Sequence, residues 1–247
     1  MTLALEELGY PTLHTIHMYS YENEEILRML DDTIISPAIA KKEAVVGKAD
    51  LALIANSGYQ AIADLPFILF FEQIHEEYPD CKFILTTRET SEIWYRSWES
   101  MTKSISNGIH IAGIVFPTIR IYSNYLRWMY AVVNKDPSYL TTTIPNDESI
   151  KENAIATYEE HNRRVRELIP PNQLLEFDVR GGWEPICTFL EITPNNCPKT
   201  PFPKTNSAKQ IHAQSVAALW FGGMLLIMMI LMIRKVAMKK RQKEKVA

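Results

Sequence analysis

Short β-prone runs alternate with helical segments along the first 190 residues. Residues 59–64 alternate between apolar and polar positions, which is typical of a short strand. Residues 82–87 form a continuous apolar, β-prone run of the kind that is buried on both faces of a parallel sheet. A further strand is predicted at 174–179. The segments with helical patterns are 3–9, 22–32, 37–56, 65–78, 91–106, 111–133, 151–169 and 183–190. Strands that alternate with helices predict an α/β fold with a parallel sheet.

The helix at 3–9 has no start signal of its own. Its leucines form a short apolar stripe and Gly9 is a typical stop, so the pattern predicts the end of a helix that begins before Met1. Polar residues and prolines predict a surface loop at 134–150 and a coil from 193 to 209.

An uncharged apolar run of 18 residues extends from Val216 to Ile233. At 1.5 Å per residue, a helix of this length spans about 27 Å, close to the hydrocarbon thickness of a bilayer. The run predicts a single transmembrane helix at 216–234. It divides the chain into a globular domain at 1–205, a linker at 206–215, the helix, and a basic tail at 235–247.

The charge of the chain is unevenly distributed. Residues 234–247 hold seven of the 26 basic residues and one of the 29 acidic residues. The remainder keeps 19 basic and 28 acidic residues and is therefore net acidic. Since neutralising phosphates requires a basic surface, this composition argues against nucleic acid as a partner and leaves the membrane as the partner of the tail.

Orientation in the membrane stays open from the sequence. The positive-inside rule places the basic tail in the cytoplasm and the domain in a lumen or outside the cell. The last five residues, KEKVA, also resemble a dilysine retrieval signal, which indicates the endoplasmic reticulum or Golgi. No apolar secretory signal follows Met1, which favours a cytosolic domain instead. The odd count of three cysteines fits reduced thiols better than a disulfide framework.

Two predicted strand ends carry residues suited to chemistry. Asp64 follows the first strand and Arg88 follows the second. A guanidinium is a fixed fork of donors for a phosphate, and a carboxylate can act as a base. The structural alternatives are a salt bridge for Arg88 and a helix cap for Asp64. His14 and His17 lack further ligands, so we interpret them as cleft or core histidines and predict no metal. The arginines between 163 and 166 predict a solvated helix face.

The order of segments resembles the P-loop sulfotransferase superfamily over nearly all of residues 3–206. The segments that carry the resemblance are ALEELGY, HTIHM, GYQAIADLP, YPDCKFILTTRETSEIWYRSW, GGWEPICTFL and PFPKTN. The resemblance implies a three-layer, P-loop NTPase-like α/β fold. It also implies transfer of a sulfuryl group from the co-substrate 3′-phosphoadenosine 5′-phosphosulfate to a hydroxyl or amine acceptor.

Three residues match functional positions of this superfamily. Arg88 resembles the arginine that binds the donor's 3′-phosphate, and Ser97 resembles its serine partner. The spacing from Arg88 to Ser97 is one residue longer than usual, so Ser91 is an alternative. Asp64 precedes Leu65-Pro66 as the catalytic histidine of cytosolic members precedes a similar Leu-Pro, which makes it the candidate base.

The glycine-rich phosphate loop of the superfamily, and the strand before it, have no counterpart in the chain. The resemblance therefore implies a truncation before the helix that follows the loop, with two strand edges left unpaired. Without the loop, a poor enzyme is expected, since losing one such donor typically costs about 10²- to 10³-fold in rate. The leading hypothesis is a membrane-anchored sulfotransferase with an incomplete N-terminus. The alternative is a non-catalytic, membrane-tethered binding or scaffold protein. A P-loop kinase is disfavoured because no Walker lysine is found.

Overall fold

The computed structural model describes part of the 247-residue chain, namely residues 1–15, 23–40, 46–104, 117–140 and 149–203. The chain forms two compact units, of which the first comprises residues 1–96 and 121–204 and the second residues 97–120 and 205–247.

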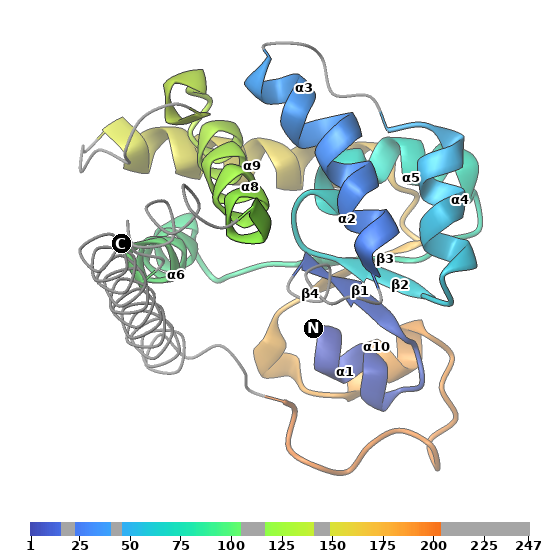
Figure 1. The fold of residues 1–247 in the computed structure, drawn as a ribbon. Helices are drawn as coiled ribbons and strands as arrows, with labels where there is room; N and C mark the ends of the chain where they lie inside the picture. Colours follow the sequence, from blue (N-terminus) through green and yellow to red (C-terminus); the bar gives the residue numbers. More distant parts are fainter. Residues whose placement is uncertain (16–22, 41–45, 105–116, 141–148, 204–247) are drawn as a thin grey trace, which may run out of the picture. The chain divides into compact units, whose positions relative to one another are not determined.

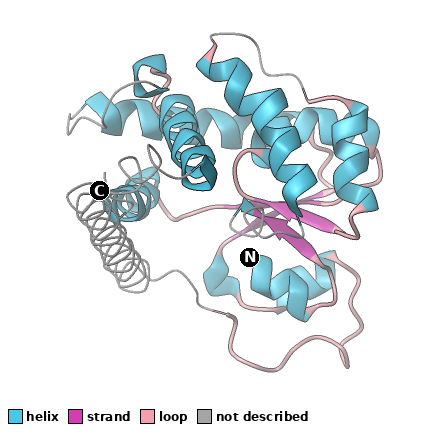
Figure 2. Ribbon diagram, in the orientation of Figure 1, coloured by secondary structure: helices cyan, strands magenta, loops and turns pink. Residues whose placement is uncertain are grey.

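Four short strands in the first unit form two parallel pairs (Figure 2). They are β1 (Thr12–His14), β2 (Ala61–Ala63), β3 (Phe83–Thr86) and β4 (Leu174–Phe177). β1 pairs with β2, and β3 pairs with β4. Within the described residues, no strand joins the two pairs. The strands predicted at 59–64, 82–87 and 174–179 are confirmed. β1 was not predicted.

Helices cover the strands on both sides. The helices that lie wholly in the first unit are α1 (Thr2–Glu7), α2 (Glu24–Leu30), α3 (Ser36–Ile39), α4 (Lys48–Asn56), α5 (Phe71–Glu77), α9 (Ser149–Leu168) and α10 (Glu184–Phe189). Short π or 3₁₀ segments are η3 (Asp31–Ile35), η4 (Phe67–Phe70), η5 (Pro137–Leu140) and η6 (Val179–Gly181). The helices α6 (Ser91–Ser104) and α8 (Pro117–Val133) extend across the boundary between the units. In Figure 1, α2, α4 and α5 lie on one side of the strands and α1 and α10 on the other.

Most predicted helices are confirmed, with one correction. The segment 37–56 is not a single helix, because α3 ends at Ile39 and a new helix begins at Lys48. Gly47 has an extended backbone, and its N–H donates to Asp50 Oδ2 at 2.8 Å, which starts α4. Gly9, which follows α1, adopts a φ of +90°, as a glycine that ends a helix does.

Two apolar clusters hold these layers together. On one side of β3, Phe71 of α5 and Val165 of α9 pack with Leu85. On the other side of the strands, Ala4 of α1 packs with Trp183 and Cys187 at α10. The helices therefore bury their apolar faces against the strand layer, as expected for an α/β protein.

A disulfide links Cys187 and Cys197, whose Cα atoms are 5.9 Å apart. The prediction of reduced thiols was therefore wrong for these two residues. The coil after α10 brings Cys197 back to Cys187, a pairing that the odd count of three cysteines did not indicate. Cys81 is free, and burial raises the pKa of its thiol to about 11.

The predicted membrane anchor cannot be compared with the fold. In the portion that the structure describes, no helix has the length and apolar character needed to cross a bilayer. The predicted linker at 206–215, the transmembrane helix at 216–234 and the tail at 235–247 lie outside the described residues. Residues 1–96 and 121–204 of the predicted 1–205 domain belong to the first unit, and residues 97–120 belong to the second. The predicted domain boundaries stay a prediction.

Candidate functional site

Arg88 lies just beyond the carboxyl end of β3 and is exposed. Its backbone N–H donates to the hydroxyl of Tyr158, on α9, at 3.2 Å. Tyr158 in turn stacks on Trp94 of α6, with 4.4 Å between ring centroids and 12° between ring planes. Within the described ranges, the guanidinium of Arg88 makes no ion pair. The fold therefore anchors the backbone of this arginine and leaves its charge available to a ligand.

A second arginine at the same edge is neutralised instead. Arg180 follows β4 and pairs with Asp178 at 2.7 Å and with Glu89 at 2.9 Å. Hydrogen bonds from Arg180, with the positive charge of Arg88 in addition, lower the pKa of the Asp178 carboxyl to about 2. Burial and the charge of Arg88 also lower the pKa of the Met1 amine. Arg88 is thus the one of these two cations that an anionic ligand would neutralise.

The two candidate serines differ in their surroundings. Ser91 donates a hydrogen bond to Glu159 Oε1 at 2.7 Å, so its hydroxyl proton is already used by a carboxylate. Ser97 is an exposed residue of α6, on the part of the helix that belongs to the second unit. Its contact with a donor stays a prediction.

The predicted base, Asp64, lies at the carboxyl end of β2 beside a histidine. His14 ends β1, and its Nε2 atom lies 3.5 Å from Asp64 Oδ2. The other carboxylate oxygen accepts a hydrogen bond from the Leu65 N–H at 2.8 Å. The side chain of Asp64 is 42% exposed, so one side of the carboxylate remains open to solvent. The hydrogen bond that Asp64 accepts from the Leu65 N–H agrees with the capping alternative. The pairing of Asp64 with His14 suits an acid–base role.

Sequence reasoning left His14 as a cleft or core histidine and did not connect it with Asp64. The connection comes from the parallel register of β1 and β2, in which His14 lies opposite Ala63. No sequence signal indicates this, because β1 itself has no recognisable pattern. His17 lies outside the described residues.

The backbone beyond Asp64 is held in place from two sides. Asp64 adopts a φ of +73°, and the Leu65–Pro66 peptide bond is cis. The hydroxyl of Tyr125 donates to the carbonyl oxygen of Leu65 at 3.0 Å, and the hydroxyl of Thr15 donates to the same oxygen. These contacts position the carboxylate of Asp64 on a rigid segment, as a reactive group requires.

A cavity of about 1000 Å³ lies between β2 and β3. Asp64 and His14 line it, together with Met1 at the start of α1. Its walls are otherwise mostly apolar and come from α4, α5, α9 and the two strands. The cavity thus extends to Asp64, the predicted base. Met1, which also lines it, is near enough to Arg88 for the charge of that arginine to lower the pKa of the Met1 amine.

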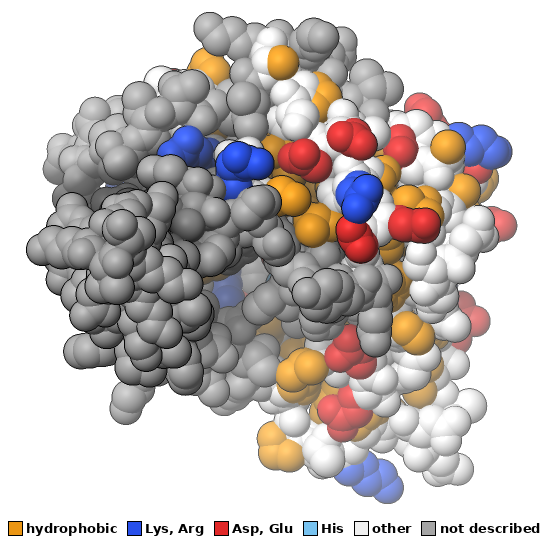
Figure 3. Space-filling model, viewed as in Figure 1, with side chains coloured by type: hydrophobic (Ala, Val, Ile, Leu, Met, Phe, Trp, Pro, Cys, Tyr) orange, Lys and Arg blue, Asp and Glu red, His pale blue; other side chains and the backbone are white. Residues whose placement is uncertain are grey.

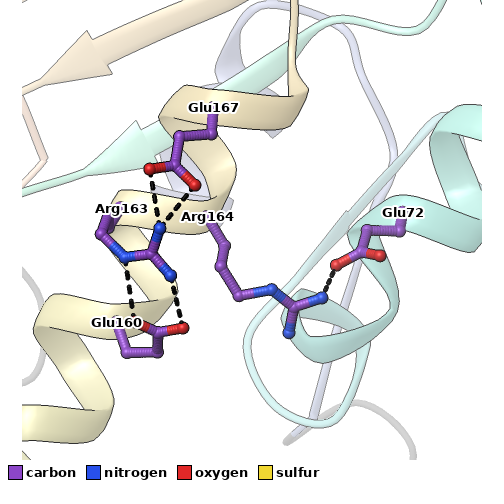
Figure 4. Close-up of polar contacts among 5 residues, drawn as sticks. All are labelled: Glu72, Glu160, Arg163, Arg164 and Glu167. Atoms are coloured by element: carbon purple, nitrogen blue, oxygen red, sulfur yellow. Dashed lines mark hydrogen bonds and ion pairs between the residues drawn. The ribbon is translucent and has the colours of Figure 1, made fainter.

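The predicted solvated face of α9 is confirmed. Arg163 lies between Glu160 and Glu167, with contacts of 2.7 and 2.6 Å, and Arg164 pairs with Glu72 of α5 (Figure 4). Arg166 pairs with Glu176 at 2.7 Å. Acidic and basic side chains also intermingle on the face shown in Figure 3. These arginines are exposed and paired, so they form a surface network rather than an anion site.

A half-buried histidine of α9, His161, provides a test of this packing by pH. Burial lowers the pKa of His161. Its ring lies edge-to-face on the ring of Phe71, with 5.7 Å between the ring centroids. The unfolded chain therefore binds this proton more readily than the folded chain. We expect the free energy of unfolding to fall as the pH drops from 7.5 to 5.5, and to fall less in His161→Gln.

Urea denaturation followed by tryptophan fluorescence at both pH values measures this difference. The window lies above the titration of Asp178, so that carboxyl does not contribute to it. His75→Gln serves as the control, since it removes a histidine that is hydrogen-bonded to Gln173 and keeps His161. An equal pH dependence in His161→Gln and the parent would contradict the prediction.

In the described segments, no group of three or more His, Cys, Asp or Glu residues is arranged to hold a metal ion. The acidic and imidazole groups at the site are the pair His14 and Asp64, which is too few for a metal centre without further ligands.

The chain is similar in sequence to known proteins. The chain is 31% identical over 144 residues to "Ava biosynthesis cluster protein M" of Aspergillus versicolor, an alignment that covers 54% of this chain and 50% of that protein. The chain thus spans about half the length of this relative. The family model "Sulfotransferase domain" matches residues 1–211. Since this match covers more than half of the chain, the protein belongs to the sulfotransferase domain family.

Proposed function

We propose that the protein binds 3′-phosphoadenosine 5′-phosphosulfate and transfers its sulfuryl group to a hydroxyl or amine acceptor. Membership of the sulfotransferase domain family supports a sulfonate donor in general. The choice of this donor rests on Arg88, in the role of binding its 3′-phosphate.

The observation that carries the proposal is the unpaired guanidinium of Arg88. Its neighbour Arg180 and the arginines of α9 are all paired with carboxylates in the described part of the chain. A phosphate is a bidentate acceptor that matches the guanidinium fork. An arginine with its backbone held and its charge unpaired is therefore the best anion site at this edge of the strands.

Asp64 is proposed as the base that takes the proton from the acceptor. Its carboxylate lines the cavity, is partly exposed and is fixed by the Leu65 N–H. His14 is proposed as a positioning residue that holds the second carboxylate oxygen. Proton removal makes the acceptor oxygen or nitrogen a better nucleophile toward sulfur, and the S–O bond to the donor phosphate then breaks.

The first test is the affinity for 3′-phosphoadenosine 5′-phosphate, the product form of the donor. We expect Arg88→Ala to weaken binding by about 10- to 100-fold, because hydrogen bonds to a charged group are lost. Isothermal titration calorimetry measures this affinity directly and does not require turnover.

Arg163→Ala is the matched control, since it removes an exposed arginine whose partners, Glu160 and Glu167, lie on its own helix. It should bind as the parent does. Equal affinities of the parent, Arg88→Ala and Arg163→Ala would remove Arg88 from the donor site. Absence of binding by a folded parent chain would favour the second candidate below.

The second candidate is a non-catalytic, membrane-tethered binding or scaffold protein. The observation that favours it is the interruption between β2 and β3 among the described strands. A sheet interrupted at its centre positions catalytic groups less rigidly than a continuous one. This candidate predicts a stable, folded chain that does not bind the nucleotide.

We further propose that residues 216–234 anchor the chain in an endoplasmic reticulum or Golgi membrane, with the domain in the lumen. The disulfide between Cys187 and Cys197 supports a lumenal domain, since disulfides persist in oxidising compartments and are rare in the cytosol. The basic tail supports the same orientation, because it is then cytoplasmic.

In this orientation, Cys187 and Cys197 should be protected from alkylation in cells, and Cys81 should be the modified thiol. Rapid acid quenching, alkylation with a maleimide polymer and gel electrophoresis count the free thiols per chain. One modified thiol per chain is expected in the parent. No modified thiol is expected in the Cys81→Ser variant. Three modified thiols in the parent would place the domain in a reducing compartment.

A further inference from the structure

The ends of β3 and β4 bring four charged side chains together. The last residues of the two strands lie opposite each other in the parallel register, and the N–H of Thr87 donates to the carbonyl oxygen of Phe177 at 2.9 Å. The chain segments that leave the strands therefore start side by side. The charged residues on them are Arg88 and Glu89 after β3, and Asp178 and Arg180 after β4.

One of these side chains, the guanidinium of Arg180, binds both carboxylates. Its Nη2 and Nε atoms donate to Asp178 at 2.7 and 3.0 Å, and its Nη1 atom donates to Glu89 Oε2 at 2.9 Å. Asp178 also accepts from the backbone N–H of Arg180 at 2.8 Å, so this carboxylate is fixed within a tight turn. Arg180 is therefore an ionic bridge that joins the end of β3 to the end of β4.

In the part of the chain that the structure describes, Arg88 is not ion-paired with the carboxylates near it. Its positive charge contributes to the lowered pKa of Asp178, which places that carboxylate within electrostatic reach. Glu89 is its neighbour in sequence. A carboxylate is a bidentate acceptor for a guanidinium, as a phosphate is. Either carboxylate would compete with a phosphate for Arg88 if Arg180 did not bind it.

The balance of charge leads to the same conclusion. The two arginines and two carboxylates are together neutral, so the group as a whole does not repel an anion. Without Arg180 the group is net negative, and the remaining cation is shared between two carboxylates. Since negative charge at a site opposes the binding of an anion, the loss of Arg180 would weaken phosphate binding at Arg88 in two ways.

We propose that Arg180 is a positioning residue for the donor site, which binds Asp178 and Glu89 and so keeps the guanidinium of Arg88 open to a phosphate. The inference rests on the proposed function, in which Arg88 binds the donor's 3′-phosphate. In this role Arg180 acts through Arg88 and touches neither the donor nor the reacting atoms. The side chain of Arg180 is 66% exposed, so its replacement removes the bridge without opening the core.

The first test measures the affinity of the full chain, in detergent, for 3′-phosphoadenosine 5′-phosphate by isothermal titration calorimetry. Arg180→Gln is expected to weaken binding about 5- to 20-fold, the order expected from two exposed charge interactions. Adding Asp178→Asn and Glu89→Gln to this variant should restore the affinity to within about threefold of the parent, because no carboxylate then competes for Arg88. The bridge is missing from both variants, so a purely structural role would not be rescued.

A second measurement does not require donor binding. Phenylglyoxal modifies unpaired guanidinium groups faster than ion-paired ones, and peptide mass spectrometry reports the rate at Arg88. We expect Arg88 to react at least about threefold more slowly in Arg180→Gln than in the parent, and at the parent's rate in the triple variant. Arg28→Gln is the matched control in both measurements, since it removes an exposed arginine that pairs with Glu24 at 2.6 Å. It should behave as the parent does.

Parent-like affinity and labelling of Arg180→Gln would overturn the proposal. A triple variant that binds as weakly and reacts as slowly as Arg180→Gln would also overturn it, since Arg180 would then act by direct contact or through the fold. A parent that does not bind the nucleotide, but whose Arg88 labelling follows the expected pattern, would remove the proposed function and support the role of Arg180. The proposal and the proposed function can therefore fail separately.

Discussion

Phe177→Ala is expected to lower the free energy of unfolding by about 3–5 kcal/mol, the usual cost of removing a buried phenylalanine. Phe177 ends β4 and is 1% exposed. Its ring lies 5.6 Å from that of Phe202, in the coil that the disulfide links to α10. The substitution removes the ring contact between β4 and this coil and leaves a cavity in the core.

Urea denaturation followed by circular dichroism measures this change. Leu168→Ala is the control, because Leu168 is 50% exposed at the end of α9 and its loss should change stability by less than about 1 kcal/mol. Similar losses in both variants would show that burial at Phe177 does not determine the stability of this unit.

Asp64→Asn is expected to lower kcat/KM for sulfuryl transfer by about 10²- to 10⁴-fold, the range for loss of a general base. Asparagine has nearly the same shape and can still accept from the Leu65 N–H, so the fold around the cis Leu65–Pro66 bond should remain. It cannot accept a proton. The affinity for 3′-phosphoadenosine 5′-phosphate should stay unchanged, because Arg88 is untouched.

Transfer of radiolabelled sulfate to a panel of hydroxyl and amine acceptors measures the rate. Glu72→Gln is the control, since it neutralises a half-buried carboxylate outside the site, which pairs with Arg164. Parent-like activity of Asp64→Asn would assign Asp64 the structural role of holding the following turn. His14→Gln then shows whether the histidine acts as the base instead. An inactive but folded parent would support the non-catalytic alternative.

The sequence by itself determined the α/β class and most of the elements. Continuous apolar runs such as 82–87 and long amphipathic helices such as α9 carry periodic signals, because one or both faces must be buried wherever they lie. Gly9 was recognisable as a helix stop because it is suited to the positive φ that it adopts. The order of motifs identified the sulfotransferase family, and Asp64 and Arg88 were predicted at strand ends where the structure has them.

Only the tertiary structure decided which of these residues meet. The register of β1 and β2 brings His14 to Asp64, and Arg180 neutralises Asp178 and Glu89 while Arg88 stays unpaired within the described residues. The disulfide and the cavity between β2 and β3 likewise depend on contacts between distant segments. Periodicity records which face of an element is buried, but it does not record the partner across that face. Pairing, charge neutralisation and cavities therefore become visible only when the chain is folded.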